Sequence, residues 1–386
     1  MRTLFLSWVL LLACCLTTVI GCNSGITASS LAPSPSGSTL ASSGSASGTS
    51  TSPGDPQSST FVFVNNAGTG PDLQAFRLNN DGSLVAVSES PYAHGSQMLG
   101  VAGGYLIAGS AGEMATYHID ARSGTVSQVS SLVNGEPSIA GNNNFVYAGG
   151  SNAIYGYALT NGQLLPLPGF PYGVTANPCN CATPFYSHLA VRNGYLFYSV
   201  NADHAGSWFE VKKIESDGTL SDVNTASCNK NSSDAINVTP DGRFIYSAAG
   251  ALPSLEISVF DSNSGNLGCG QLTGPHDLFD SGVIDPGGHL LFAHQNFTSV
   301  EIGSYQIDST TGQLTPAVSF PSSGQPEAID PSGRYLLTIE TPSATTFAIG
   351  VYSIDSSTGS LNQLGNYPLG SDSAAFFPVK LVVAQF

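Results

Sequence analysis

The chain has 386 residues, of which 9% are charged and 41% are hydrophobic, and its formal net charge is −16. A protein this acidic is repelled by phosphate backbones and by anionic lipid surfaces, so we expect no nucleic-acid partner. Its 44 Gly and 23 Pro predict many turns and short strands rather than long helices.

Residues 1–21 have the pattern of an export signal. Arg2 is followed by an uncharged apolar run that ends at Ile20, and Gly21 and Cys22 come next. This arrangement resembles the bacterial lipoprotein signal, which implies cleavage before Cys22 and lipid on its sulfur and amino terminus. Two alternatives stay open, an ordinary signal peptide and an uncleaved anchor. The apolar run is, however, shorter than the roughly 20 residues that a membrane-spanning helix needs.

Residues 22–59 are predicted to form a flexible tether. They contain no aromatic residue, and Asp55 is their only charge among Ser, Gly, Thr, Ala and Pro. Such a segment buries too little apolar surface to offset the entropy of ordering it. The chain would then be lipid-anchored to the cell envelope. Asn23 in place of Asp after the lipidated cysteine favours the outer membrane or the cell surface.

A hairpin recurs seven times after the tether. Each copy has a strand of alternating apolar residues, a turn that ends in Gly, and a second short strand. The copies begin 40 to 55 residues apart, at Leu73, Met114, Ile154, Phe209, Ile257, Ile302 and Ile349. This period is typical of one four-stranded β-propeller blade, which buries its faces only against neighbouring blades.

The two ends of the repeat region are predicted to share one blade. The segment from Thr60 to Val64 has the composition of a strand without an inner partner, and the C-terminal strand has no hairpin after it. Pairing these segments would close the ring and remove its exposed strand edges. The sequence therefore predicts an all-β fold, a seven-bladed propeller over residues 60–386, with a monomeric head.

Four of the hairpin turns place an Asp four residues before a Gly. An Asp in this position either caps backbone N–H groups of the turn or, as the Asp261-x-Asn263-x-Gly265 spacing hints, belongs to a calcium loop. The recurrence, without a Glu at the distance that a calcium loop requires, favours capping. The four residues are Asp120, Asp261, Asp308 and Asp355.

The repeats resemble a known family. Asp-Pro-x-Gly turns at 285–289 and 330–334, and Tyr-x-Ile-Asp-x-x-Thr-Gly-x-Leu hairpins at 305–314 and 352–361, are similar to those of lactonase-like and Tyr-Val-Thr-Asn-repeat seven-bladed propellers. The resemblance covers nearly all of 60–386. It implies the propeller fold strongly and the chemistry weakly, because propeller function is carried by loops.

Propeller sites usually lie where the innermost strands begin, at one mouth of the central channel. Acidic residues and a histidine at those positions suit general acid–base catalysis, a divalent cation, or hydrogen bonds to backbone N–H groups at blade junctions. The four acidic residues are the candidate metal ligands. The catalytic candidates are Glu136, His188, Asp234, Asp280 and Glu327.

Basic residues argue against a phosphorylated substrate. Phosphate recognition favours Arg or Lys, but Arg192, Arg243 and Arg334 are predicted to lie in tight turns at the far face of the propeller. Among the basic residues considered, Lys230 alone is expected in a loop on the side of the candidate site.

Four cysteines remain after the lipidated one, in an exported and oxidising setting. Disulfides are favoured over a zinc site, which lacks the usual paired spacing. A bridge from Cys179 or Cys181 to Cys228 is expected because these cysteines lie in loops between successive blades. Cys269 is the fourth. The insertion at 168–187, the longest between blades, is expected to form a rim lid or a partner contact, with a disulfide-tied spacer as the alternative.

Two functions follow from these patterns. The chain contains none of the common motifs of serine hydrolases, zincins or nucleotidases, so the first hypothesis is a lipid-anchored module that binds a protein, peptide or glycan. The alternative that the family implies is a lactone hydrolase of the 6-phosphogluconolactonase type, acting at the channel mouth with a possible divalent cation.

Overall fold

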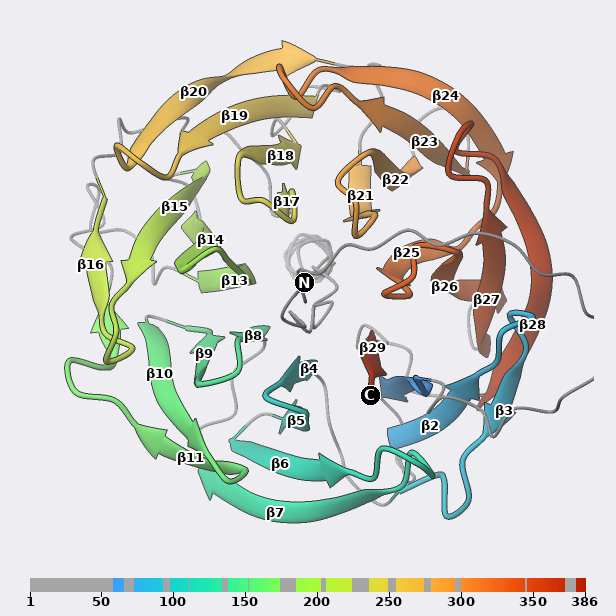
Figure 1. Ribbon diagram of the computed structural model, residues 1–386, viewed down its shortest axis with the longest axis horizontal. Coiled ribbons are helices and arrows are strands. Elements are labelled where there is room, and N and C mark those ends of the chain that lie inside the picture. The colour runs from blue at the N-terminus through green and yellow to red at the C-terminus, as the bar shows by residue number, and fades with distance from the viewer. Residues whose placement is uncertain are drawn as a thin grey trace, which may run out of the picture.

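The computed structural model describes 58–65, 73–92, 98–110, 112–133, 138–151, 153–173, 185–202, 206–223, 236–248, 255–273, 279–295, 300–343, 346–371 and 380–386. These residues form seven antiparallel sheets arranged in a ring, with one strand of each sheet innermost, next to the propeller axis (Figure 1). No helix long and apolar enough to span a membrane occurs within these ranges. The prediction of an all-β, seven-bladed propeller is confirmed.

One sheet contains both ends of the propeller. From the channel outward its strands are β29 (Leu381–Gln385), β1 (Thr60–Asn65), β2 (Leu73–Leu78) and β3 (Leu84–Ala86). In the β1–β29 pair, Val62 lies opposite Val383, and Ser59 and Phe386 exchange two backbone hydrogen bonds of 3.0 Å. The predicted closure between the terminal strands is confirmed.

The other six blades follow in chain order, and each begins at the channel. The second and third are β4 (Met98–Ala102), β5 (Tyr105–Ser110), β6 (Glu113–Ile119) and β7 (Val126–Val133), then β8 (Ser138–Gly141), β9 (Phe145–Gly149), β10 (Ala153–Thr160), β11 (Gln163–Pro166) and the short β12 (Tyr172–Gly173).

The fourth and fifth blades are β13 (Phe185–Arg192), β14 (Tyr195–Ala202), β15 (Gly206–Ile214) and β16 (Leu220–Asp222), then β17 (Ile236–Val238), β18 (Phe244–Ala248), β19 (Leu255–Asp261) and β20 (Asn266–Thr273). The last two are β21 (Phe279–Ile284), β22 (Leu290–Gln295), β23 (Glu301–Ile307) and β24 (Leu314–Pro321), then β25 (Gln325–Ile329), β26 (Tyr335–Ser343), β27 (Thr346–Ile354) and β28 (Leu361–Ser371).

The hydrophobic core is divided among the interfaces between blades. Seven buried clusters each combine residues of two neighbouring sheets. Strand β1 shows why: Phe61 and Phe63 pack toward the β4–β7 blade, whereas Val62 and Val64 pack toward the β25–β28 blade. Successive side chains of a strand point to opposite faces, so every sheet covers both of its neighbours.

The Asp residues of the hairpin turns cap the backbone, as predicted. Each of the four accepts a hydrogen bond from the backbone N–H two residues later, over 2.9–3.0 Å. At Asp308, for example, hydrogen bonds to Thr311 lower the pKa of the carboxyl. These turns therefore stabilise the hairpins of the rim.

Candidate functional site

Three innermost strands have an extra residue near the point where they begin. The pairing register shifts between Ser187 and Ala190 in β13, between Phe279 and Ser281 in β21, and between Pro326 and Ala328 in β25. The pairings of the other four innermost strands, over their described residues, continue without such a shift. A β-bulge redirects the side chain at the extra position, and bulges are common beside functional sites.

Sequence candidates occupy all three bulges. They are His188, Asp280 and Glu327. His188 also has a φ of 52°, a left-handed conformation that is rare for a residue with a Cβ atom. Backbone strain of this kind persists where the surrounding structure holds it and often marks functional sites.

His188 is buried, and its two ring nitrogens have different surroundings. Nδ1 lies 3.1 Å from Ser187 Oγ and 3.2 Å from Ser199 Oγ. Ser199 Oγ donates to the Ser187 carbonyl over 3.1 Å, and the two hydroxyls lie 2.8 Å apart. With the Ser187 hydroxyl donating to Ser199, both hydroxyl protons are used, and Nδ1 is then the donor to these oxygens.

In this tautomer, the remaining nitrogen of His188 is an acceptor without a partner. Nε2 is buried and has no hydrogen-bond partner among the described atoms. Burial, followed by the nearby charge of Lys380, lowers the pKa of His188 to about 3. The ring is therefore neutral near pH 7, and its Nε2 lone pair is able to accept a proton from a ligand hydroxyl group.

Lys380 and Glu327 form an ion pair beside the channel. Lys380 directly precedes β29, and Glu327 lies in β25 of the adjacent blade. The Nζ–Oε1 distance is 3.9 Å, and the side chains are 4% and 1% exposed. Asn65 fixes the backbone of Lys380. The backbone N–H of Asn65 donates to the Lys380 carbonyl over 3.0 Å, and the side-chain oxygen of Asn65 accepts from the Lys380 N–H.

The three groups lie at one end of the channel and offer complementary chemistry. All belong to, or directly precede, the start of an innermost strand, and the charge of Lys380 reaches His188 in a blade that is not its neighbour. An ammonium donor, a carboxylate acceptor and a neutral imidazole acceptor can together bind the hydroxyl and carbonyl or carboxylate groups of a small polar molecule.

The structure describes the sequence-predicted site only in part. Asp280 is placed by its backbone alone. Glu136 and Asp234 lie outside the described residues, as do Cys22, Cys179, Cys181, Cys228, Lys230 and most of the 168–187 insertion; the Cys269 side chain is also undescribed. Among the described side chains, no three His, Cys, Asp or Glu residues are grouped to hold a metal ion.

Lys380 was not predicted from the sequence as a site residue. Cations were expected in the loops between hairpins, whereas Lys380 comes immediately before the closing strand. Aligning the sequence Val-Lys-Leu-Val-Val with the starts of the other innermost strands would have found it. The channel mouth therefore contains a cation in addition to the one expected at Lys230.

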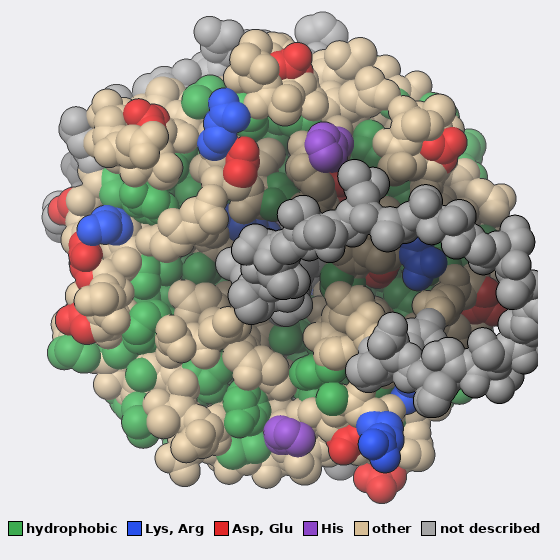
Figure 2. Space-filling view, viewed as in Figure 1, with side chains coloured by type: hydrophobic (Ala, Val, Ile, Leu, Met, Phe, Trp, Pro, Cys, Tyr) green, Lys and Arg blue, Asp and Glu red, His purple; other side chains and the backbone are tan. Residues whose placement is uncertain are grey.

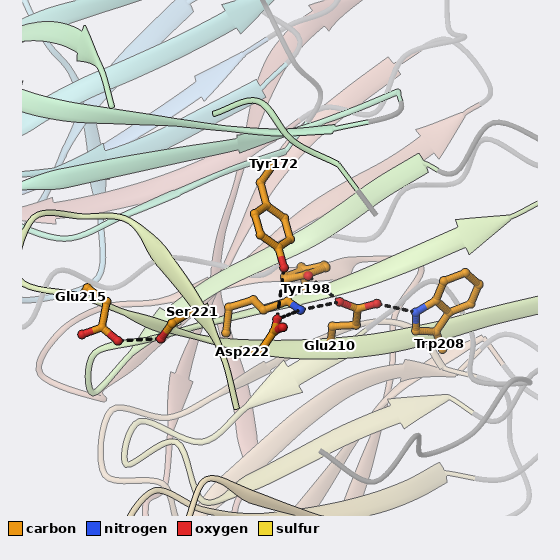
Figure 3. Close-up of polar contacts among 8 residues, drawn as sticks. Tyr172, Tyr198, Trp208, Glu210, Glu215, Ser221 and Asp222 are labelled. Carbon is orange, nitrogen blue, oxygen red and sulfur yellow. Dashed lines mark hydrogen bonds and ion pairs between the residues drawn. The ribbon is translucent and has the colours of Figure 1, made fainter. Parts of the chain in front are cut away.

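A second polar network joins two blades near the rim (Figure 3). Lys212 donates to Asp222 over 2.7 Å, and its ammonium lies 3.4 Å from Glu210. Glu210 also accepts from Tyr198 over 2.6 Å and from Trp208 over 3.0 Å. Tyr172, from β12 of the preceding blade, donates to Asp222 over 3.2 Å.

Electrostatics in this network favour a structural role. Burial opposes the charge of Lys212, but hydrogen bonds to Asp222 and Tyr172 and the nearby charge of Glu210 together outweigh burial, and the pKa of Lys212 is raised. The hydrogen bond from Lys212 lowers the pKa of Asp222. Because the charges and donors satisfy one another, the network fixes β12 against the neighbouring blade.

Comparison with known proteins supports the fold. No protein-family model and no curated protein matches the sequence. A candidate 6-phosphogluconolactonase from Bacteroides fragilis, known from its crystal structure, is 16% identical in sequence to this chain. The two structures match with a TM-score of 0.63 over 87% of this chain and 100% of the other chain. The periplasmic gluconolactonase of Pseudomonas aeruginosa is 16% identical, with a TM-score of 0.62 over 84% of this chain and 99% of that one.

A further match lacks a stated activity. A protein from Lactobacillus plantarum is 15% identical, with a TM-score of 0.62 over 84% of this chain and 100% of its own. Identities this low establish a shared lactonase-like propeller fold, and the chemistry must be argued from the channel residues themselves.

Proposed function

We propose that this protein is an envelope-tethered propeller that binds a small polyhydroxylated acid, or its lactone, at the channel end formed by His188, Glu327 and Lys380. The three bulged innermost strands carry the proposal, because they coincide with the sequence candidates. Similar folds named as lactonases support this ligand class.

Each side chain has a role in the proposed complex. Lys380 would donate to a carboxylate or carbonyl oxygen, and Glu327 would accept from hydroxyl groups while keeping Lys380 charged. His188 Nε2 would accept one further hydroxyl proton. Recognition by buried polar groups is selective, since a ligand that lacks the matching group leaves a buried donor or acceptor without its partner.

The tether is part of the same proposal. After cleavage of the apolar run, the lipid on Cys22 and the Ser-rich segment up to residue 59 would hold the propeller at an outer membrane or cell surface. Incorporation of labelled palmitate into the wild-type protein, and its loss in Cys22→Ala, would test this assignment.

Lactone hydrolysis is the second candidate function. It is favoured by His188 Nε2, which has no hydrogen-bond partner among the described atoms, and by the nearby charge of Lys380. Water would add to the lactone carbonyl, the ring C–O bond would break, and a hydroxy acid would form without an oxidant. Lys380 would stabilise the oxyanion as negative charge develops on the carbonyl oxygen. His188 Nε2 would take the proton of the attacking water, although its low pKa makes it a weak base.

Calorimetric titration of the whole protein with D-gluconate, combined with pH-stat assay of D-glucono-1,5-lactone, tests both candidates. Binding without turnover supports a binding module, and turnover that His188→Asn abolishes supports a hydrolase. Asp222→Asn, at the rim, is the matched control and should leave either signal unchanged. Absence of both binding and turnover would overturn the proposal.

A further inference from the structure

A small cavity lies farther along the channel, beyond the His188 bulge. Its volume is about 30 Å³, and innermost strands of four consecutive blades line it, together with the turn after β17. A cavity of this size holds one or two water-sized particles. Its principal lining residues are Ala190, Arg192, Asn237, Pro240, Gly282 and Ala328.

Small residues create this space. Ala190, Gly282 and Ala328 each follow a bulge residue within two positions along an innermost strand. A Cβ atom on Gly282 would lie 3.1 Å from the Asn237 amide nitrogen, which is tighter than ordinary packing. Glycine therefore allows the amide to approach the neighbouring strand.

Arg192, the last residue of β13, brings a positive charge to the cavity. Its Nη1 donates to the Val191 carbonyl over 2.9 Å. Within the described part of the chain, this is the only hydrogen bond of the guanidinium, and no carboxylate lies within ion-pair distance of it. Burial lowers the pKa of Arg192, yet an arginine remains charged at physiological pH.

Acidic residues at this end of the channel are engaged in their own turns. Asp285 accepts from the backbone N–H groups of Gly287, His289 and Leu290. Asp330 likewise accepts from the N–H groups of its own turn. Neither offers Arg192 a counter-charge, and an uncompensated charge is costly where it is partly removed from water, as at the half-buried Arg192.

We propose that Arg192 and Asn237 bind a small monovalent anion in this cavity, either a halide such as chloride or a single carboxylate group. The guanidinium has unused N–H donors, and the Asn237 amide can add another. The limited volume favours a monovalent anion of this size over phosphate. This site lies toward the opposite end of the channel from Lys380 and is independent of the function proposed above.

Chloride-35 NMR line broadening on the whole protein tests the proposal. Wild type is expected to broaden the chloride signal, and Arg192→Gln to lose most of that broadening. Arg243→Gln is the matched control, because Arg243 lies in the corresponding turn of the next blade, where it donates to Ser309 over 3.1 Å and is exposed. The Arg243→Gln variant should broaden the chloride signal as much as wild type does.

Formate supplies the carboxylate arm of the same experiment. Saturating formate should displace chloride from wild type and sharpen the signal, because one carboxylate has the same charge and a similar size. Equal broadening in wild type and Arg192→Gln, or broadening that formate leaves unchanged, would overturn the proposal. Circular dichroism should show that Arg192→Gln is folded; if it is not, Arg192→Lys, which keeps the charge, is expected to retain weaker, formate-sensitive broadening.

Discussion

Two lysine–carboxylate pairs in this propeller have similar chemistry but different surroundings. At the rim, Lys212 and Asp222 are 2.7 Å apart, and the Asp222 side chain is 80% exposed. At the channel, Lys380 and Glu327 are 3.9 Å apart, with side chains 4% and 1% exposed. The shorter pair is the more exposed one.

This difference separates a structural contact from a candidate site. The rim pair forms a direct hydrogen bond, Asp222 also accepts from Tyr172, and Lys212 also lies close to Glu210. The channel pair is too far apart for a direct hydrogen bond, and it lies beside a histidine with a bare nitrogen. On the face shown in Figure 2, charged side chains occur singly or in small groups. The Lys380–Glu327 pair differs from these surface charges because both of its side chains are buried.

The largest expected effect is loss of stability in Glu327→Ala. Removing one member of a buried ion pair typically costs about 3–5 kcal/mol, since the other charge stays buried. Urea unfolding should therefore show a free energy of unfolding that is lower by roughly 3 kcal/mol. The Glu327→Leu/Lys380→Met double variant, which removes both charges, should recover most of that loss. A single variant as stable as wild type would contradict the burial argument.

His188 should make the protein sensitive to acid. Its pKa is about 3 in the folded state and near 6.5 when unfolded, so the unfolded chain binds more protons between these values and stability falls as the pH drops below 6.5. From pH 6.5 to 5 this single group should cost roughly 2 kcal/mol. From about one pH unit above 6.5 upward it should have no effect.

His188→Asn removes that titration and tests the prediction. The free energy of unfolding of the variant should fall less between pH 6.5 and 5 than that of wild type. His289→Asn is the control, because His289 lies in an exposed turn and its side chain is 72% exposed. Identical pH dependence in wild type and His188→Asn would show that His188 is not buried as described.

Tyr198→Phe should have an intermediate effect at the rim. The variant removes one buried hydroxyl that donates to Glu210 over 2.6 Å. Glu210 keeps its contacts with Trp208 and Lys212, so thermal or urea unfolding should show a loss of about 1–2 kcal/mol. A loss as large as that of Glu327→Ala would erase the distinction between the two regions.

Asp222→Asn should have the smallest effect. Exposed ion pairs contribute about 0–1 kcal/mol and are screened by salt. The destabilisation measured by urea unfolding should therefore stay below about 1 kcal/mol and shrink further in 1 M salt. A loss that is large and independent of salt would show that the rim pair is effectively buried.

The blade architecture could be predicted from the sequence because it is local and repeated. The residues of each hairpin are enough to predict its two strands and its turn. The strand segment at Thr60 has no partner nearby in the sequence, so it was predicted to pair with the C-terminal strand. His188 and Glu327 could be selected because the sequence pattern placed them near the starts of innermost strands. The closing pair and the blade count needed no knowledge of side-chain packing.

The geometry of the site could not be predicted in the same way. A bulge depends on the register of two strands, which the sequence of one strand does not determine. The residues around His188 likewise give no signal from which its left-handed φ could be predicted. Lys380 meets Glu327 only because the ring closes, with 52 residues between them in the sequence. The Tyr172–Asp222 contact is likewise a product of blade packing.

The most direct test of the channel site is D-gluconate binding in two matched lysine variants, Lys380→Met and Lys212→Met. Each removes one lysine charge while keeping an unbranched apolar side chain. Calorimetric titration should show binding by wild type and Lys212→Met, and at least a tenfold weaker affinity in a folded Lys380→Met. Equal affinity in Lys380→Met and wild type would contradict the assignment of the channel end as the ligand site.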